Sequence, residues 1–358
     1  VVRATDHISD MIAAIEKLTE RGLTYASDGS VYYRIAGFPS YGKLSRIDVS
    51  GMRSGARVDM DEYDKADARD FALWKAGKPG EPCWEAPFGS GRPGWHIECS
   101  VMAMKYLGET LDIHTGGVDL VFPHHENEIA QSEAITGKPF VRYWLHAEFL
   151  LIDGQKMAKS AGNFFTLRDV LGRGYAPEAV RYLLASVPYR KQLNFTFDAL
   201  SSAVTAIERL RNFRLRLQTD RLPAGENPRV TQMGEEARRQ FEAGLDDDLN
   251  TARALGAVFE YVREVNTLMD AGELRAGNVA GASDLLERFD SIFDVLETRG
   301  QGRLSAEEIQ RAIEERVAAR KARDFARADQ IRRELAEQGV ILEDTKEGTR
   351  WKYGGGQV

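Results

Sequence analysis

Cysteine is scarce in this sequence: Cys83 and Cys99 are the only two among 358 residues, too few for a disulfide framework. Proline is sparse as well, with 11 residues, and a composition that is 43% hydrophobic and 29% charged excludes a disordered or collagen-like chain. No run of about 18 apolar residues occurs, and the first ten residues lack the basic-then-apolar pattern of a signal peptide. We therefore expect a folded cytoplasmic protein that does not bind membranes.

An excess of positive charge is also missing, because 48 Lys and Arg face 55 Asp and Glu, for a formal net charge of -7. This balance excludes a protein that coats nucleic acid by bulk charge alone. The charge is unevenly distributed, since residues 311–333 hold eight basic and four acidic side chains. A local surface for nucleic acid is therefore compatible with the acidic total, although a solvated helix face is the commoner origin of such a run.

Histidine is concentrated, with five of the six residues between positions 96 and 146. If His124 opens a helix, it lies four residues from Glu128 on the same face. Zinc accepts thiolate, imidazole and carboxylate ligands together, so Cys99 would complete three corners of a tetrahedral site, with His125 pointing elsewhere. Ordinary packing of these side chains in a core is the alternative.

Two lysines lie in the polar segment Lys156-Met157-Ala158-Lys159-Ser160, after a predicted strand. Such a loop can bring compact ammonium groups against phosphates and neutralise charge in phosphoryl chemistry. A solvated surface loop is the ordinary alternative, and the five-residue pattern alone does not decide between the two.

The hydrophobic periodicity predicts an α/β region followed by an all-α region. A hairpin is expected around Asp28-Gly29, which supplies the positive φ angles of a tight turn. Residues 36–93 are rich in turn-forming residues and are predicted to be irregular. Between 94 and 165, short apolar runs alternate with helical patterns, which indicates a parallel sheet with crossover helices. From 166 onward the pattern is helical, until two short strands within 340–352.

Longer strings of residues resemble one enzyme family. Lys156 to Ser160 matches the K-M-S-K-S signature of class I aminoacyl-tRNA synthetases, with Ala158 in place of the first Ser. Within that class, Gly94 to Ser100 (GWHIECS) and Phe122 to Gln131 (FPHHENEIAQ) look like the zinc-binding signatures of cysteinyl-tRNA synthetases. The resemblance continues through Asp246 to Thr251 of a DALR-type helical domain and into the C-terminal region, so it covers essentially the whole chain.

The resemblance implies a reaction in which ATP activates L-cysteine as cysteinyl-adenylate and the acyl group passes to tRNA(Cys). It implies one Zn²⁺ per subunit, Mg²⁺ with the ATP, and a monomer. The residues that match the family are metal ligands Cys99, His124 and Glu128, catalytic and ATP-binding Lys156 and Lys159, ATP-binding Ser160, amino-acid pocket residues Trp95, His96 and Asp119, and tRNA-binding Arg320, Lys321, Arg323, Arg350 and Trp351.

The same resemblance implies that the chain divides into five parts, in the order in which the domains follow one another in this family. They are a connective region at 1–93, the second half of a Rossmann-like catalytic domain at 94–165, a stem-contact helical region at 166–228, a DALR-type helical bundle at 229–300, and a small α+β anticodon-binding module at 301–358.

One family signature is missing at the front. The family begins with a half nucleotide-binding fold that carries the H-I-G-H signature and a further zinc cysteine, and neither occurs here. We therefore expect that the sequence starts inside or just after that half. Two alternatives follow: the cysteine ligase of mycothiol biosynthesis, which has no need of an anticodon module, and a non-catalytic tRNA-binding fragment.

Overall fold

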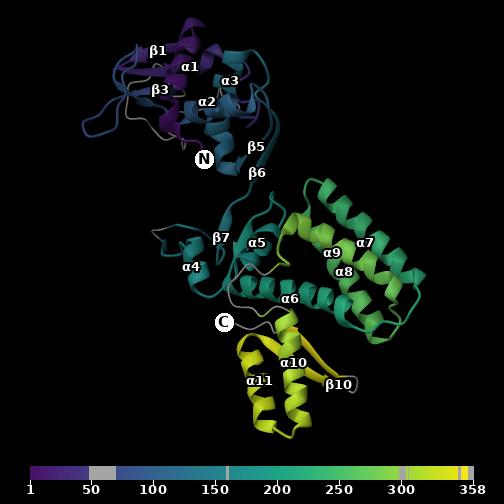
Figure 1. The fold of residues 1–358 in the computed structure, drawn as a ribbon. Coiled ribbons are helices and arrows are strands. Elements are labelled where there is room, and N and C mark those ends of the chain that lie inside the picture. The colour runs from purple at the N-terminus through teal and green to yellow at the C-terminus, as the bar shows by residue number, and fades with distance from the viewer. Residues whose placement is uncertain (48–69, 159–160, 298–303, 305, 346–347, 354–358) are drawn as a thin grey trace. The chain divides into compact units, whose positions relative to one another are not determined.

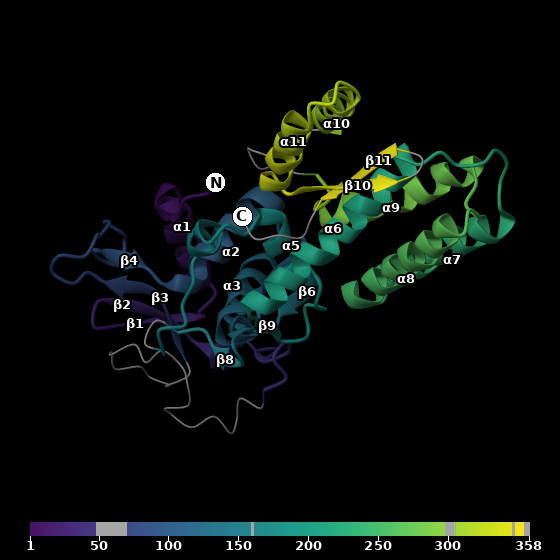
Figure 2. The same cartoon turned by 90° about the horizontal axis from the view of Figure 1, so that it is seen from below.

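The computed structural model describes residues 1–47, 70–158, 161–297, 304, 306–345 and 348–353. The chain divides into two compact units, Val1–Glu148 and Phe149–Val358. The first unit is α/β and the second is mainly helical (Figures 1 and 2), which confirms the predicted order. Within the described ranges, no helix is both long and apolar enough to cross a membrane.

The first unit consists of short helices and strands. Its elements are η1 (Ala4–His7), α1 (Ile8–Glu20), β1 (Thr24–Ser27), β2 (Ser30–Tyr33), η2 (Ile35–Gly37), β3 (Phe71–Ala76), β4 (Gly91–Pro93), α2 (Trp95–Leu107), β5 (Leu111–Gly117), η4 (Val118–Leu120), η5 (Val121–His125), α3 (Glu126–Thr136) and β6 (Val141–Ala147).

An antiparallel sheet, in the order β1-β2-β3-β4, contributes to the main core of this unit (Figure 2). Asp28 and Gly29 join β1 to β2 with φ angles of 48° and 74°, so the predicted hairpin is confirmed. The prediction that 36–93 is irregular is wrong at β3 and β4. Because β3 is buried from Phe71 to Trp74 on both faces, its sequence lacks the alternation that marks a half-exposed strand.

The strands β5 and β6 pair in parallel, with α3 in the connection between them. This pairing confirms the parallel sheet predicted within 94–165. It places His114 opposite Trp144, and Gly116 opposite His146. The side chains of two strands that are far apart in sequence are thereby brought next to the first turn of α3.

The second unit opens with a small sheet, in the order β8-β7-β9, and continues as helices. Its elements up to the bundle's end are β7 (Leu150–Ile152), β8 (Gln155–Lys156), α4 (Leu167–Gly172), α5 (Pro177–Ala185), β9 (Leu193–Phe195), α6 (Phe197–Thr219), α7 (Pro228–Asp246), α8 (Thr251–Asp270), η7 (Ala276–Asn278) and α9 (Val279–Phe293). The strand β9 lies where the sequence pattern predicted only helices. Figure 1 shows α7, α8 and α9 side by side, and their apolar faces share one core.

The C-terminal module is a helix pair followed by a hairpin. It comprises α10 (Ala306–Lys321), α11 (Phe325–Glu337), β10 (Val340–Thr345) and β11 (Gly348–Tyr353). The two predicted strands are confirmed, because β10 and β11 pair in antiparallel register along their whole length. Ile309, Ile313, Ile331 and Leu335 of the helices pack with Val340 and Leu342 of β10 in a small separate core.

Candidate functional site

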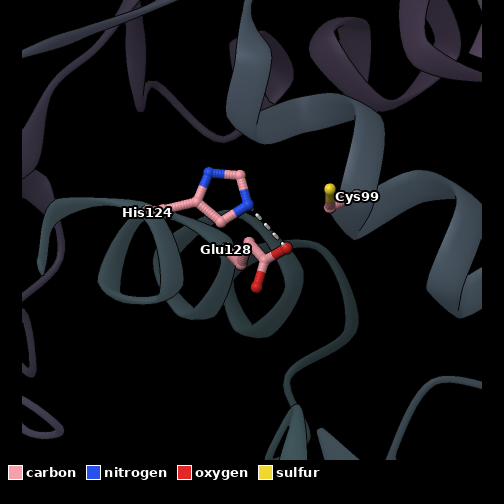
Figure 3. Close-up of side chains that lie close together, drawn as sticks. All are labelled: Cys99, His124 and Glu128. Carbon is pink, nitrogen blue, oxygen red and sulfur yellow. Dashed lines mark ion pairs between the residues drawn. The ribbon is translucent and has the colours of Figure 1, made fainter. Parts of the chain in front are cut away.

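Three side chains of the first unit form a potential metal site. Cys99 comes from α2, His124 from the turn before α3, and Glu128 from the first turn of α3 (Figure 3). The sulfur, one ring nitrogen and one carboxylate oxygen all lie within 4.8 Å of one another. Tetrahedral zinc bonds of about 2.0–2.3 Å put ligand atoms about 3.3–3.8 Å apart, so this donor set needs only a small closure to fit the ion.

The backbone around α2 sets the position of Cys99. Gly94 ends the turn from β4, and its amide donates to the carbonyl of Leu73 at 2.8 Å. A Cβ atom at Gly94 would lie 2.0 Å from the carbonyl oxygen of Ala72, so glycine is what allows α2 to start this close to β3. Ser100 then donates to the side chain of Gln131 at 2.7 Å, which joins α2 to α3 inside the unit.

The first turn of α3 is held on its opposite side by a buried carboxylate. Glu126 accepts hydrogen bonds from the amides of Gly42, Leu44 and Ser45 at 3.1, 2.7 and 2.6 Å, and from the Ser45 hydroxyl at 2.9 Å. Glu126 therefore faces the 42–45 segment while Glu128 faces Cys99. The rotation of α3 that aims Glu128 at the other two ligands is fixed by this anchor.

The electrostatics of the ligand set favour an anionic carboxylate. Glu128 is fully buried, which opposes ionisation, but contacts with the His114 and His124 rings outweigh burial and lower its pKa to about 2. Its Oε2 accepts a hydrogen bond from His114 Nε2 at 2.8 Å. Its Oε1 lies 3.3 Å from His124 Nε2, an ion-pair distance, but without hydrogen-bond geometry. A buried carboxylate oxygen that lacks a hydrogen-bond partner fits a role as a metal ligand.

The thiol of Cys99 lies in a different environment. Burial, together with the carboxylates of Glu128 and Glu98, raises the pKa of this thiol to about 12. A bound cation would reverse that balance, because metal coordination favours the thiolate. Cys83 is exposed, outside the metal-ligand candidates, and its sulfur donates to the carbonyl of Glu81 at 3.4 Å.

A second histidine cluster adjoins the ligand set, and sequence reasoning did not assign it. His125 is not part of the Cys99-His124-Glu128 set, as predicted, but His114, His125 and Glu128 also offer ligand atoms within 4.8 Å of one another. Its Nδ1 lies 2.8 Å from His146 Nε2, and both rings pack against Trp144. Burial lowers the pKa of His125 to about 4, which keeps the ring neutral.

The predicted pocket residues have different surroundings. Trp95 is 54% exposed and packs on the rings of His96 and His124, with centroids 5.4 and 4.4 Å away. His96 Nδ1 lies 2.9 Å from His124 Nδ1. These two residues therefore border the ligand set. Asp119 is exposed on η4, and no described contact joins it to the ligands.

The lysine segment belongs to the second unit. Lys156 is exposed at the end of β8, with its Nζ 4.9 Å from the centroid of the Phe149 ring. Asn163 closes the loop, because its Oδ1 accepts from the amide of Ala158 at 2.9 Å and its Nδ2 donates to the carbonyl of Lys156 at 3.2 Å. Lys159 and Ser160 lie outside the described residues.

The residues predicted to bind tRNA all lie in the C-terminal module. Arg320 and Lys321 end α10, and Arg323 follows in the turn to α11 with a φ of 61°; all three are exposed. Arg350 lies on β11 opposite Glu343, and Trp351 packs partly into the small core of this module. The module thus gathers three exposed cations around one helix end.

Part of the basic charge counted in 311–333 is neutralised within the module. Arg316 is only 1% exposed and pairs with Asp344, which also receives Arg320 at 3.3 Å. Arg327 pairs with Glu315 at 2.7 Å. The cations available to a ligand are therefore fewer than the sequence count indicates.

Comparison with protein-family models assigns each part of the chain. The model described as "tRNA synthetases class I (C) catalytic domain" matches residues 1–205, and the "DALR domain" model matches 240–297. The "Cysteinyl-tRNA ligase anticodon binding domain" model matches 305–351. An anticodon-binding domain has no use in a ligase that joins cysteine to a sugar, so this match speaks against the mycothiol alternative.

Curated relatives agree along nearly the whole chain. A cysteine–tRNA ligase of Solibacter usitatus is 64% identical over 98% of this chain and 76% of its own length. Those of Koribacter versatilis and Geobacter sulfurreducens are 52% and 47% identical, each over 98% of this chain and 77% and 76% of their lengths.

A solved structure of low sequence identity shares the fold. The Mycobacterium tuberculosis methionyl-tRNA synthetase in complex with methionyl-adenylate superposes with a TM-score of 0.56 at 14% identity, over 80% of this chain and 73% of that one. The family models and the relatives agree on one assignment, and this likeness agrees with its fold. The chain belongs to the cysteine–tRNA ligases, class I aminoacyl-tRNA synthetases that charge tRNA(Cys) with cysteine.

Proposed function

We propose that Cys99, His124 and Glu128 hold a zinc ion that selects cysteine by its thiol. The observation that carries this proposal is the convergence of a thiol, an imidazole and a buried carboxylate within 4.8 Å. Zinc in this place supplies a bond to the thiolate of cysteine that the hydroxyl of serine replaces poorly, and loss of a dedicated polar contact discriminates by roughly 10⁴ or more.

Two further histidines orient the ligands. His96 Nδ1 lies 2.9 Å from His124 Nδ1, and with the proton of this contact on His124 the Nε2 atom of His124 would keep its lone pair for the ion. His114 holds Oε2 of Glu128 and leaves Oε1 for the ion. With Trp95 exposed above the His124 ring, Trp95 and His96 would line the amino-acid pocket, and Asp119 would receive the substrate ammonium from its exposed position.

The lysine loop is proposed to act on ATP. Class I activation proceeds by attack of the cysteine carboxylate on the α-phosphorus, with pyrophosphate as the leaving group, so charge accumulates on phosphate oxygens. Ammonium groups at Lys156 and Lys159 would neutralise that charge together with Mg²⁺, and Ser160 would bind a phosphate oxygen. Asn163 supports this role because its side chain binds the backbone of Lys156 and Ala158 and so joins the end of the loop to its start.

The C-terminal module is proposed to contact the anticodon region of tRNA. Arg320, Lys321 and Arg323 project from one helix end, which suits phosphate contacts. Arg350 and Trp351 of β11 would add a cation and an aromatic face for an unpaired base.

Zinc binding by variants tests the central assignment. Zinc affinity is measured by competition with a chromophoric chelator for the unmodified protein, Cys99→Ser and the matched control Cys83→Ser. We expect one zinc per chain, an unchanged affinity in Cys83→Ser, and a loss in Cys99→Ser beyond the roughly 10–100-fold that removal of an outer partner causes. Equal affinities for the two serine variants would refute the site.

Catalysis is tested separately. Cysteine-dependent exchange of pyrophosphate into ATP distinguishes an enzyme from a non-catalytic tRNA-binding fragment, because exchange requires adenylate formation and needs no tRNA. We expect exchange that depends on cysteine and is not supported by serine at equal concentration. Binding of tRNA without any exchange would favour the fragment.

A further inference from the structure

The residues that follow α9 are bound through their backbone by a buried arginine. Arg211 of α6 is 7% exposed, and its Nε donates to the carbonyl of Leu296 at 3.0 Å. Its Nη2 donates to the carbonyls of Val295 and Glu297 at 2.9 and 3.2 Å. One guanidinium therefore holds three consecutive peptide groups.

Two more arginines bind the same stretch. Arg214, one turn further along α6, donates to the carbonyl of Leu296 at 3.1 Å and to the carboxylate of Glu297 at 2.6 Å. Arg181 of α5 donates to the carbonyls of Ile292 and Phe293. We name Arg181, Arg211 and Arg214 the arginine clamp.

The clamp reaches beyond what a helix end needs. The helix α9 ends at Phe293. Arg211 and Arg214 bind carbonyls of residues 295–297, which lie past the end of the helix. Asp290 holds the same stretch from the other side, because its Oδ1 accepts from the amides of Val295 and Leu296 at 2.8 Å each. Both amides and carbonyls of this stretch are thus bound, and Val295 and Leu296 are buried.

The arginine clamp lies at the boundary between two domains. Arg181 lies in the catalytic-domain match, and α6 begins within that match. The clamped residues are the last of the DALR match, which ends at 297, and the anticodon-binding match begins at 305. The helix α5, inside the catalytic-domain match, and the helix α6, which continues out of it, therefore hold the final residues before the connection to the anticodon-binding module.

We propose that the arginine clamp is an anchor that fixes where the connection to the anticodon-binding module starts, which makes Arg211 and Arg214 positioning residues for tRNA binding. The inference rests on tRNA recognition by that module. Release of residues 293–297 would add up to about 17 Å of reach at about 3.4 Å per residue. The effective concentration of a tethered module falls at least as the −3/2 power of tether length, so tRNA affinity falls while adenylate chemistry is untouched.

Variants on one helix test the anchor. Arg214→Met is the first variant, because its side chain is 34% exposed and its loss leaves no buried charge. Arg211→Met combined with Glu208→Gln is the second, since Glu208 is the buried partner of Arg211 at 3.1 Å. Arg216→Met is the matched control, because Arg216 lies on α6 but binds Asp220, Asn266 and Asp270 instead.

The readout separates tRNA binding from chemistry. In the intact enzyme we expect KM for tRNA(Cys) to rise at least about twofold in both clamp variants, while cysteine-dependent ATP–pyrophosphate exchange stays equal to that of Arg216→Met. Hydrogen exchange at residues 293–297 should increase in parallel, and this measurement needs no tRNA. A KM for tRNA equal to that of Arg216→Met, or exchange activity that falls together with charging, would overturn the proposal.

Discussion

The buried ion pair between Arg316 and Asp344 makes the C-terminal module sensitive to one substitution, Asp344→Asn. The two guanidinium nitrogens Nη1 and Nη2 each donate to one oxygen of Asp344 at 2.9 Å. Arg316 is 1% exposed, and its Nε has no hydrogen-bond partner in the described part of the chain. Asp344 is therefore the main compensation for a charge that water cannot reach.

The expected decrease in the free energy of unfolding is large for a module of this size. Removal of one partner of a buried pair costs about 3–5 kcal/mol, and since the side chain of Asp344 is 38% exposed, we expect about 2–3 kcal/mol. A domain of roughly fifty residues is stabilised by only about 3–7 kcal/mol. Asp344→Asn should therefore unfold an appreciable fraction of the module at 37 °C and leave the bundle intact.

Hydrogen exchange resolved by peptide is the assay, because it reports the module and the bundle separately in the intact enzyme. Glu315→Gln, which breaks the exposed pair with Arg327, is the matched control and should leave the stability of the module almost unchanged, because exposed pairs contribute little. Arg316→Met combined with Asp344→Asn should recover much of the loss, since no buried charge remains. Protection of α10 and α11 in Asp344→Asn that equals the control would refute this reasoning.

Three other predictions concern the catalytic part and pH. Gly94→Ala should weaken zinc binding and lower the melting temperature, because the new Cβ meets the Ala72 carbonyl at 2.0 Å and α2 must shift; unchanged zinc affinity in chelator competition would contradict this. Asn163→Ala should slow cysteine-dependent ATP–pyrophosphate exchange about tenfold without loss of zinc, because the end of the loop is no longer joined to the backbone of Lys156 and Ala158; equal rates would argue against a role for the loop. The guanidinium of Arg316 holds the pKa of Asp344 well below its usual range, so the stability that this pair contributes is present above about pH 4 and is lost as the pH falls further. Hydrogen exchange of α10 between pH 5 and 3 would show this loss, and its absence in Asp344→Asn is the control.

Local signals in the sequence were sufficient for part of the fold. The Asp28-Gly29 turn was predictable because two positive φ angles in succession are demanded by the hairpin and tolerated by few residues. The strands β3 and β4 were not, because β3 is buried on both faces and β4 is only three residues long, paired with β3 by tertiary contacts. Strands of this kind show no alternation of apolar and polar residues in the sequence, so periodicity cannot predict them.

The same distinction holds for the site. His124 and Glu128 are four residues apart at a helix start, so their convergence follows from helix geometry alone. His114, His146 and Trp144 come from two parallel strands, and only the register of β5 against β6 brings them together. The available signal was the crowding of five histidines into 96–146, with His146 two residues after Trp144 on one strand.

The charge of the C-terminal module was overestimated for a related reason. A count of basic residues within 311–333 cannot show that Arg316 is buried against Asp344, which lies outside the counted stretch on β10. Exposure decides which cations can meet a phosphate, and exposure is set by tertiary packing.

The most direct test of the central claim is X-ray absorption at the zinc edge, measured on the zinc-loaded protein before and after addition of cysteine. We expect a sulfur shell at about 2.3 Å from Cys99, nitrogen and oxygen scatterers at about 2.0–2.2 Å, and one additional sulfur when cysteine is added but none with serine. A sulfur shell that does not change with cysteine, or that survives in Cys99→Ser without substrate, would contradict it.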